Sequence, residues 1–517
     1  MRHVIGIDIS TQTISAMLIG VVEADGRPVE LVISSAWVET RACRDELSRK
    51  SLGVWIELVR ECIAGLKRKA REAETAEAVG VSTTFPGCFA ILRGGDVDAQ
   101  FVSLYDNTDD AGICSGEFET ELGRAEAETY SRMWPGNMAI GLARIMRRDG
   151  LRLDMVDGIV PPNTAFSHQL MRLVGVDAAE LITDFSQAAI GGLYDARSGE
   201  PVPSAVADLL NKAVPGMDPP TLRSLLPKLA PAWRNTIPAD AVGAVGGLLG
   251  LAKLKSVSIG AGDSPLGALA LISGDDTVIN VRGSSDSPMI IVDSPKSKDG
   301  ARENVLHYPM PTATHLADSP WCVVAPMLRS GRVWDWVRRL RFDNDTPDAD
   351  VELEKLALQA AINKDKAALH FHTALGGERA PDWDSTAAGA LRGLVESHTI
   401  GDIALAALEG MSGTLKECIG LMERRYDVKP EKLLLVGGPA KNRLWNWITQ
   451  RHTGKKTFAT TFSDASLLGA ALLGYGAMYD GLEHDSAIAK RLGALSKLSA
   501  SHKLISPRPV SAPAEDI

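Results

Sequence analysis

The chain has little of what marks several large classes of protein. Its 517 residues include only six cysteines, which are scattered without a Cys-x-x-Cys pair or a metal-ligand spacing. That pattern disfavours a disulfide scaffold and a cysteine-bound metal, and it suits a reducing compartment, so we expect a cytoplasmic protein. The formal net charge of −10 disfavours nucleic acid or an anionic membrane as the main partner.

Long apolar runs are also missing. The longest, at 465–478, is too short and too rich in glycine to span a bilayer, and it predicts a buried helix. Asp8 interrupts the only early apolar run, so we expect no signal peptide. The P-loop signature GxxxxGK[ST] does not occur, and the stretch GAGDSP at 260–265 lacks the third glycine of a dinucleotide fingerprint.

The remaining pattern is that of an α/β protein with more than one domain. At 517 residues the chain exceeds the size of a single core. Strand-like and helical runs alternate along it. The predicted strands are 3–9, 14–22, 78–82, 87–93, 255–260, 277–282, 288–292 and 432–436. The predicted helices include 54–73, 136–149, 168–174, 352–362, 402–424 and 440–452.

A weak internal repeat suggests how the domains are arranged. Residues 7–19 align without gaps with residues 279–291, and the polar turn of the first segment falls on the polar turn of the second. Two such hairpins would open two similar domains. We therefore expect one domain at 1–253 and a second at 254–490. Residues 491–517 lack a sustained apolar face and are expected to form a mobile tail.

The first hairpin places Asp8 in a strand, just before the turn Ser10-Thr11-Gln12-Thr13. One interpretation is a hairpin whose tip is polar because tips meet water. The other is a phosphate-binding turn, in which small residues offer N–H and O–H donors to phosphate oxygens. A carboxylate beside such a turn is useful when Mg²⁺ lies between the two groups.

Two further stretches each allow a structural and a chemical interpretation. Asp263 follows a predicted strand and precedes an apolar helix, so it is either a helix N-cap or a base that takes a proton from an attacking hydroxyl. Gly437 and Gly438 end a buried strand just before a helix. They form either a tight turn or a surface that a flat base or an α-phosphate can approach.

Taken together, these stretches resemble the FGGY family of carbohydrate kinases over roughly residues 3–485. Six motifs occur in the family's order: GIDISTQTISAML (6–18), ITDFSQAAIGGLYDARSGEP (182–201), SIGAGDSPLGAL (258–269), INVRGSS (279–285), LGGERAPDWDSTAAGALRGL (375–394) and VGGPAKNRLWNWI followed by DASLLGAALLG (436–474). The resemblance implies two actin-like (ribonuclease H-like) domains that bind ATP in the cleft between them.

The resemblance also implies roles for particular residues. Asp8 would lie on the side of the Mg²⁺ ion, Asp263 would be the general base, and Ser264 would lie beside it at the substrate. The residues implied for the nucleotide are Thr11, Gln12, Thr13, Gly283, Ser284, Gly331, Gly438 and Asn442, the last beside the adenine.

The chain departs from the family where the sugar would lie. Xylulokinases carry GQMHG where this chain has TTFPG at 83–87, and many relatives carry a W.D.R pattern where it has YDNTD at 105–109. Thr84, Phe85 and Asn107 are therefore the expected substrate contacts, together with Asp263 and Ser264. Phe85 and Pro86 offer no strong side-chain hydrogen bonds, and Asp109 stands where relatives often have a base.

The expected function is ATP-dependent phosphorylation of a hydroxyl of a small sugar or polyol, of the pentulose type. The alternative is a sugar-responsive ATPase or regulatory binding protein without phosphoryl transfer, against which the presence of Asp263 argues. A chaperone or filament-type actin relative is disfavoured by the GERAPDWDS segment at 377–385. We expect a small-molecule partner, neither nucleic acid nor membrane, and a homodimer.

Overall fold

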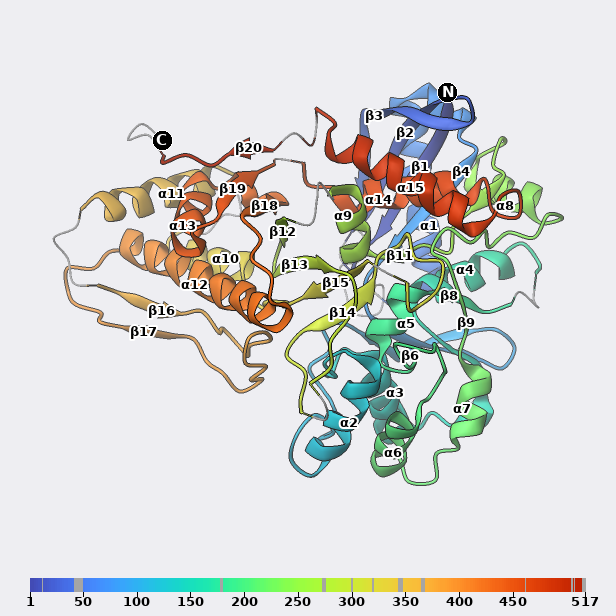
Figure 1. The fold of residues 1–517 in the computed structure, drawn as a ribbon, viewed down its shortest axis with the longest axis horizontal. Helices are drawn as coiled ribbons and strands as arrows, with labels where there is room; N and C mark the ends of the chain where they lie inside the picture. The colour runs from blue at the N-terminus through green and yellow to red at the C-terminus, as the bar shows by residue number, and fades with distance from the viewer. Residues whose placement is uncertain are drawn as a thin grey trace.

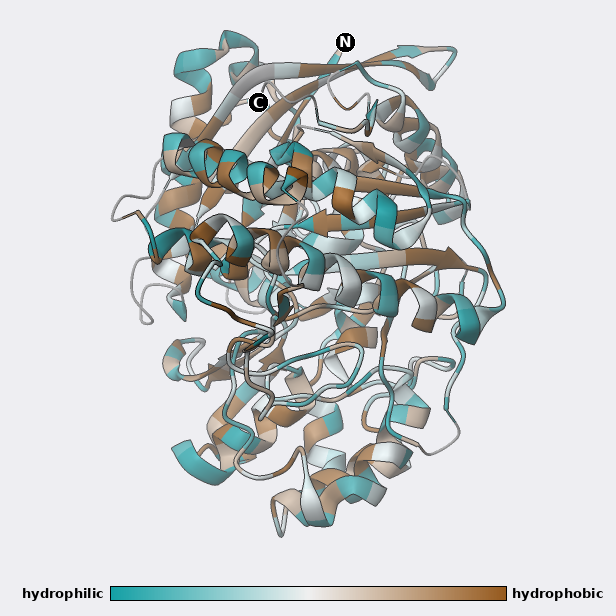
Figure 2. Cartoon of the chain, turned by 90° about the vertical axis from the view of Figure 1, so that its left-hand side faces the viewer, coloured by the Kyte–Doolittle hydropathy of each residue, from teal (hydrophilic) through white to brown (hydrophobic). Residues whose placement is uncertain are grey.

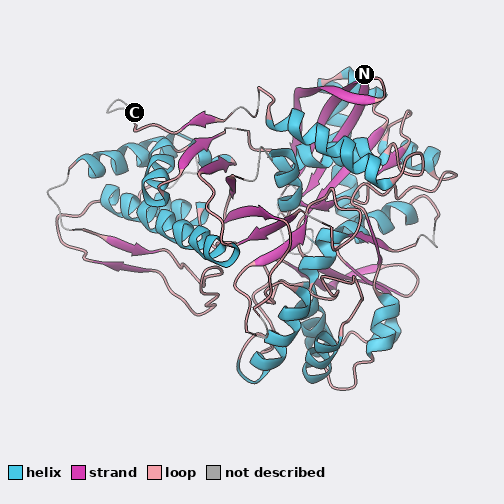
Figure 3. Ribbon diagram, viewed as in Figure 1, coloured by secondary structure: helices cyan, strands magenta, loops and turns pink. Residues whose placement is uncertain are grey.

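The computed structural model describes residues 1–517 except 12, 41–49, 177–179, 272–275, 299–300, 319, 343–346, 364–367, 461, 504, 506 and 514–517. Two α/β units lie side by side, each with a sheet and flanking helices (Figures 1 and 3). The sheet strands are mostly apolar, whereas the outer faces of the helices are largely hydrophilic (Figure 2), as expected for helices that cover a core.

The first sheet has the order β10-β4-β1-β2-β3, with β11 also paired to β4. Its strands β1, β2 and β3 run antiparallel, and β4, β10 and β11 run parallel to β1. The bounds are β1 Arg2–Ile9, β2 Ile14–Ala24, β3 Arg27–Thr40, β4 Ala78–Thr83, β10 Ser256–Val257 and β11 Ala261–Gly262. In this register the carboxyl ends of β1, β4 and β11 meet at one edge.

The second sheet repeats that order. Its strands follow the path β14-β15-β13-β12-β18-β19-β20, in which β12, β13 and β15 are antiparallel and β18 and β19 are parallel to β12. The bounds are β12 Thr277–Arg282, β13 Asp286–Val292, β14 Leu306–Pro309, β15 Trp321–Val324, β18 Lys432–Val436, β19 Lys456–Ala459 and β20 Arg508–Pro509. The hairpin repeat seen in the sequence thus opens two sheets of the same topology, the two-domain actin-like arrangement.

An additional lobe extends from the first sheet, at the lower right of Figure 1. It contains the three-stranded sheet β6-β5-β7 and the pair β8-β9. The strands are β5 Gly87–Leu92, β6 Val97–Leu104, β7 Val156–Val160, β8 Ile182–Asp184 and β9 Lys228–Ala230. A separate pair, β16 His370–His372 and β17 Ala390–Arg392, forms an arm beside α12 (Figure 1).

The helices cover both sheets and fill the additional lobe. Those of the first half are α1 Leu52–Lys69, α2 Glu119–Thr129, α3 Met138–Arg144, α4 Pro162–Arg172, α5 Phe185–Gly191, α6 Ser204–Ala213, α7 Pro219–Leu225 and α8 Val242–Leu249. Those of the second half are α9 Asp263–Leu271, α10 Gly331–Arg339, α11 Pro347–Ile362, α12 Ile400–Tyr426, α13 Arg443–Thr453, α14 Ala465–Ala477 and α15 Asp485–Ala500.

Helix α14 packs on the first sheet although it is encoded near the end of the chain. A Cβ on Gly6 of β1 would come within 2.3 Å of the Leu467 carbonyl oxygen, and one on Gly80 of β4 within 1.7 Å of that of Ala470. On the opposite side, a Cβ on Gly469 would come within 2.1 Å of the Leu266 carbonyl oxygen in α9. Only glycine allows backbones to approach this closely.

The division of the chain differs from the predicted boundary at 253. Strands β10 and β11 lie after that boundary but pair with β4, so the first sheet continues past it. The predicted tail also differs. Its first ten residues continue α15, where Leu492 and Leu495 are buried, and its later residues 508–509 pair with β19.

Candidate active site

The turns after β1 and β12 face one cavity of about 940 Å³ between the two sheets. Its lining includes the predicted nucleotide residues Thr11, Thr13, Gly283, Ser284, Gly331, Gly438 and Asn442. Gln12 lies outside the described residues. Seven predicted residues from four separate segments therefore meet around a single space.

The first turn is held by its own hydroxyl groups. The Ser10 amide donates to the Thr13 carbonyl oxygen at 3.0 Å, and the Thr13 amide donates to Ser10 Oγ at 3.1 Å. The Ser10 side chain therefore closes the turn. Thr11 also lines the cavity, and its hydroxyl pairs with the phenol of Tyr105.

The second turn is packed closely against the start of α10. The amide of Gly331 donates to the Gly283 carbonyl oxygen at 3.1 Å, and a Cβ on Gly331 would lie 2.3 Å from that same oxygen. Position 331 must therefore be glycine, because a side chain there would collide with the Gly283 backbone. Gly283, in contrast, has open space on its Cβ side, with the nearest atom 3.8 Å away.

The two glycines after β18 differ in the same way. Gly437 has φ +106°, and a Cβ there would lie 2.0 Å from the Arg282 carbonyl oxygen. Gly438 has nothing within 4 Å of its Cβ position and lines the cavity. Asn442, beyond it, caps α13 by accepting a bond from the Trp445 amide at 2.7 Å. Asn442 also lines the cavity.

Asp8 lies at the carboxyl end of β1, below the first turn. Its carboxylate accepts hydrogen bonds from Ser82 of β4 and, at 3.3 Å, from Ser466 of α14. Burial raises the pKa of the Asp8 carboxyl, and the two serine bonds oppose that effect. Segments near both ends of the chain therefore hold this carboxylate in place.

Asp263 follows β11 at the start of α9, close to Asp8. Burial and then the charge of Asp8 raise the pKa of Asp263 to about 7. Its carboxylate accepts a hydrogen bond from the Ser264 amide, at 2.7 Å. Ser264 Oγ is hydrogen-bonded to the Tyr308 hydroxyl at 2.7 Å. The carboxyl is thus poised to exchange a proton near neutral pH, as a general base requires.

The residues beside Asp263 fit a ligand with several hydroxyl groups. Thr84 Oγ1 and Gln187 Oε1 are buried and have no hydrogen-bond partner among the residues that the structure describes. Gln187 is anchored by a 3.1 Å bond from its Nε2 to Thr83 Oγ1, at the end of β4. Buried polar atoms rarely remain unpaired, so these two are natural partners for a bound polar molecule.

Phe85 forms an apolar wall of the same region. Its ring lies 5.2 Å from that of Tyr308, edge to face, and a Cβ on Gly262 would come within 2.4 Å of it. Asn107, in contrast, is engaged by its own loop. Its amide nitrogen donates to the carbonyl oxygens of Asp109 at 2.7 Å and Pro135 at 3.2 Å.

Three side chains that sequence reasoning did not single out complete this end of the cleft. Arg379 donates to the Tyr105 carbonyl oxygen at 2.9 Å, and its guanidinium lies 5.9 Å from the Tyr105 ring and 5.8 Å from the Trp134 ring. Arg379 falls inside the GERAPDWDS motif, so a cation in a family motif was the available signal. Tyr105 opens the YDNTD stretch at 105–109, whereas Trp134 carried no signal.

Across the residues that the structure describes, no three His, Cys, Asp or Glu side chains gather as a metal site. A lone carboxylate beside a phosphate turn is compatible with Mg²⁺, because that ion takes most of its ligands from phosphates and water. No helix in the described ranges has the length and apolar character to cross a membrane.

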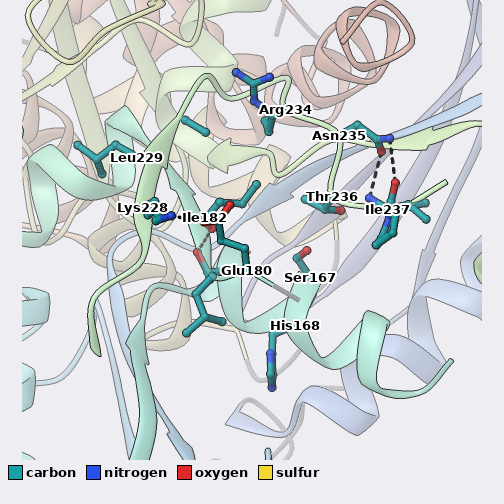
Figure 4. A pocket seen from close by; sticks show the side chains of 14 residues that line it. Ser167, His168, Glu180, Ile182, Lys228, Leu229, Arg234, Asn235, Thr236 and Ile237 are labelled. Carbon is teal, nitrogen blue, oxygen red and sulfur yellow. Dashed lines mark hydrogen bonds and ion pairs between the residues drawn. The ribbon is translucent and has the colours of Figure 1, made fainter. Parts of the chain in front are cut away.

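A second cavity, of about 520 Å³, lies beside α4 and β9 (Figure 4). Its lining contains Lys228, which forms an ion pair with Glu180, and Arg234, which is paired with Asp480 at 2.7 Å. The lining includes neither carboxylate of the site nor any residue of the two phosphate turns. Its charges are already paired, and we assign it no role.

Comparison with known proteins agrees with this geometry. Residues 280–478 match the sequence model of the FGGY family of carbohydrate kinases, C-terminal domain. Over these residues, which are fewer than half of the chain, the protein is similar to the FGGY family of carbohydrate kinases. It is 27% identical over 379 residues to the xylulose kinase of Klebsiella pneumoniae, covering 71% of this chain and 70% of that protein.

Other relatives carry different names. The gluconokinase of Bacillus subtilis is 26% identical over 306 residues, or 57% of this chain and 55% of that protein. Among solved structures, ligand-bound xylulose kinase from Lactobacillus acidophilus superposes with a TM-score of 0.73 at 19% identity, covering 96% of each chain. These comparisons confirm the predicted fold and family. The chain is a carbohydrate kinase that phosphorylates a small sugar with ATP.

Proposed function

We propose that this FGGY kinase transfers the γ-phosphoryl group of ATP to a hydroxyl of a sugar or polyol of about pentulose size, with Asp263 as the general base. The observation that carries the assignment is the placement of Asp263. Its carboxyl, with a pKa of about 7, lies beside Asp8 at the strand ends that carry the first phosphate turn.

The acceptor hydroxyl gives its proton to the Asp263 carboxylate, and its oxygen forms a bond to the γ-phosphorus. The bond from that phosphorus to the bridging oxygen breaks, and ADP leaves. Such transfers have loose transition states, so the protein mainly positions the groups and neutralises charge. The turns at Thr11–Thr13 and Gly283–Ser284 are the proposed phosphate contacts, and Gly438 and Asn442 face the nucleoside.

Mg²⁺ is the proposed metal, with Asp8 on its side of the cleft. When bound, the ion would neutralise phosphate charge. Asp8 itself keeps its orientation through Ser82 and Ser466. Thr84 and Gln187 would pair with acceptor hydroxyls, and Phe85 would contact a carbon face. Asn107 is proposed to act on the acceptor through its loop. A cytoplasmic location and a homodimer remain predictions.

Two variants test the proposal against the regulatory alternative. Asp263→Asn should retain ATP and acceptor binding but lose roughly 10²–10⁴-fold in turnover. ADP release should be screened across ketoses, aldoses, polyols and sugar acids, with the exposed Asp240→Asn as the matched control. Near-normal turnover by Asp263→Asn would contradict the base assignment. ATP hydrolysis without any phosphorylated acceptor would favour the regulatory reading.

A further inference from the structure

Tyr105 reaches the cleft from the additional lobe. It lies in the turn that follows β6, where the Asn107 amide donates to the Leu104 carbonyl oxygen at 2.9 Å. Tyr105 lines the same cavity as Thr11 of the first turn and Ser284 of the second. A residue from outside the two main sheets therefore borders the space between both turns.

The backbone of Tyr105 is held from two distant segments. Its carbonyl oxygen accepts hydrogen bonds from Arg379 Nη2 at 2.9 Å and from Trp134 Nε1 at 3.3 Å. A Cβ on Gly136 would lie 2.0 Å from the same oxygen, so the chain after Trp134 packs directly against it. The Arg379 guanidinium also lies 5.9 Å from the centre of the Tyr105 ring. These contacts fix the position from which the phenol extends into the cavity.

The phenol of Tyr105 is hydrogen-bonded to the hydroxyl of Thr11. Two hydroxyl groups that pair in this way use one of their two hydrogens, so one O–H group remains to donate to a third atom. Among the residues that the structure describes, neither hydroxyl has a second hydrogen-bond partner. Burial raises the pKa of Tyr105, so the phenol stays protonated near neutral pH and does not repel an anion. The pair therefore offers one donor to the cavity, and phosphate oxygens are acceptors.

We propose that Tyr105 is a further catalytic residue, whose hydroxyl acts with that of Thr11 to hold the phosphoryl group while it passes from ATP to the acceptor. This inference rests on the proposed kinase function and adds a residue to it. The acceptor oxygen bonds to phosphorus, the bond to ADP breaks, and the acceptor proton goes to Asp263. Tyr105 gives up no proton and forms no covalent bond. The hydroxyl pair donates a hydrogen bond to one of the oxygens over which the transferred group spreads its charge.

Tyr105→Phe removes the hydroxyl and keeps the ring. With the ketoses, aldoses, polyols and sugar acids of the screen, we expect kcat to fall ~10–100-fold while the KM values for ATP and acceptor stay unchanged. ADP with aluminium fluoride and Mg²⁺ mimics the phosphoryl group in transfer. Calorimetry on the intact enzyme should show that Tyr105→Phe weakens this complex by the same factor as kcat. A non-hydrolysable ATP analogue should bind the variant as tightly as the wild type.

A second variant, Thr11→Val, tests the pairing of the two hydroxyls. Because they act as one donor, the double variant should lose little more than the larger single loss, and additive losses would contradict the proposal. Tyr479→Phe is the matched control and should change neither kcat nor binding. Tyr479 lies beyond the carboxyl end of α14, where its hydroxyl donates to Glu23.

Unchanged kcat in Tyr105→Phe would overturn the proposal. Equal weakening of the ATP analogue and the aluminium fluoride complex would also overturn it, because the hydroxyl would then serve packing or ATP binding. A raised KM for every acceptor at unchanged kcat would assign the phenol to the acceptor instead. If the wild type releases ADP without phosphorylating any acceptor, the kinase function is refuted, and the aluminium fluoride complex still decides whether Tyr105 contacts the phosphoryl group.

Discussion

Asp8 and Asp263 lie within electrostatic range of each other at the ends of β1 and β11. Burial raises the pKa of Asp263, and the Asp8 charge raises it further, to about 7. Two acids placed together in this way cannot both ionise easily. The relationship therefore predicts both how activity depends on pH and how the site affects stability.

The first prediction concerns the pH dependence of activity. Because a general base must be deprotonated, kcat/KM should fall as pH drops through about 7, the pKa of Asp263 in the free enzyme. Ionic strength and Mg²⁺ should be held constant across the profile. A rate that stays flat from pH 8 down to pH 5.5, with the chemical step shown to limit it, would contradict the assignment.

The second prediction concerns stability. The pKa of Asp263 is higher in the folded protein, at about 7, than its ordinary value of 3.8, so the native state binds more protons than the unfolded one. This carboxyl therefore lowers stability progressively as pH rises from about 4 to about 7. Asp263→Asn should raise the free energy of unfolding at pH 8 by on the order of 2 kcal/mol and have little effect at pH 4.5.

Denaturant unfolding at both pH values measures this difference. The control variant Asp240→Asn, at an exposed position, should change the free energy of unfolding by the same amount at both pH values. If Asp263→Asn is destabilising at pH 8, the carboxylate is satisfied in the folded protein and its raised pKa is wrong.

The third prediction separates the two glycines after β18. Gly438→Val should fold normally, because nothing lies within 4 Å of the new Cβ, yet it should weaken ATP binding about 10-fold or more by filling the cavity. Acceptor binding should change little. Gly437→Ala should instead lower the melting temperature, since its Cβ would lie 2.0 Å from a carbonyl oxygen at φ +106°. Equal losses of ATP and acceptor binding in Gly438→Val would indicate a packing role.

The fourth prediction concerns the acceptor. Phe85 presents a ring where xylulokinases have polar groups, and each substrate hydroxyl left unpaired costs about 1–3 kcal/mol, or ~10–100-fold. D-Xylulose and glycerol should therefore be poor substrates in competition kinetics. Phe85→His should increase the turnover of D-xylulose. Asn107→Asp should weaken the binding of every acceptor, because it removes the two hydrogen bonds that the Asn107 side chain donates within this loop region. D-Xylulose turnover equal to that of every other compound would refute this prediction.

Local patterns were sufficient to locate the two hairpin turns that line the cavity and to place Asp263 after a strand, since each lies in a strand–turn unit whose residues are contiguous. Their roles stay predictions. The acceptor end was not predictable in the same way. Tyr105, Trp134 and Arg379 come from three distant segments, and only the fold brings their side chains together.

Helix α15 shows a second reason why sequence patterns missed part of the fold. Its buried face alternates apolar residues with serines, and Ser496 and Ser499 donate to the Leu269 and Ala270 carbonyl oxygens of α9 at 2.5 and 2.7 Å. A face that is satisfied by hydrogen bonds gives a weak hydropathy signal. The segment was therefore predicted to be a mobile tail.

The packing of α14 has a consequence for how the protein is made. Gly6 and Gly80 lie in strands that are synthesised early. The backbone that packs against them belongs to residues 467–470, which are synthesised late. Ser466, which holds Asp8, leaves the ribosome with that same helix. The face of the first sheet that α14 covers therefore stays uncovered until nearly the entire chain has been synthesised. A nascent chain in this state exposes apolar strands that chaperones bind, so translation speed should affect the yield of active kinase more strongly than in proteins whose domains are closed locally.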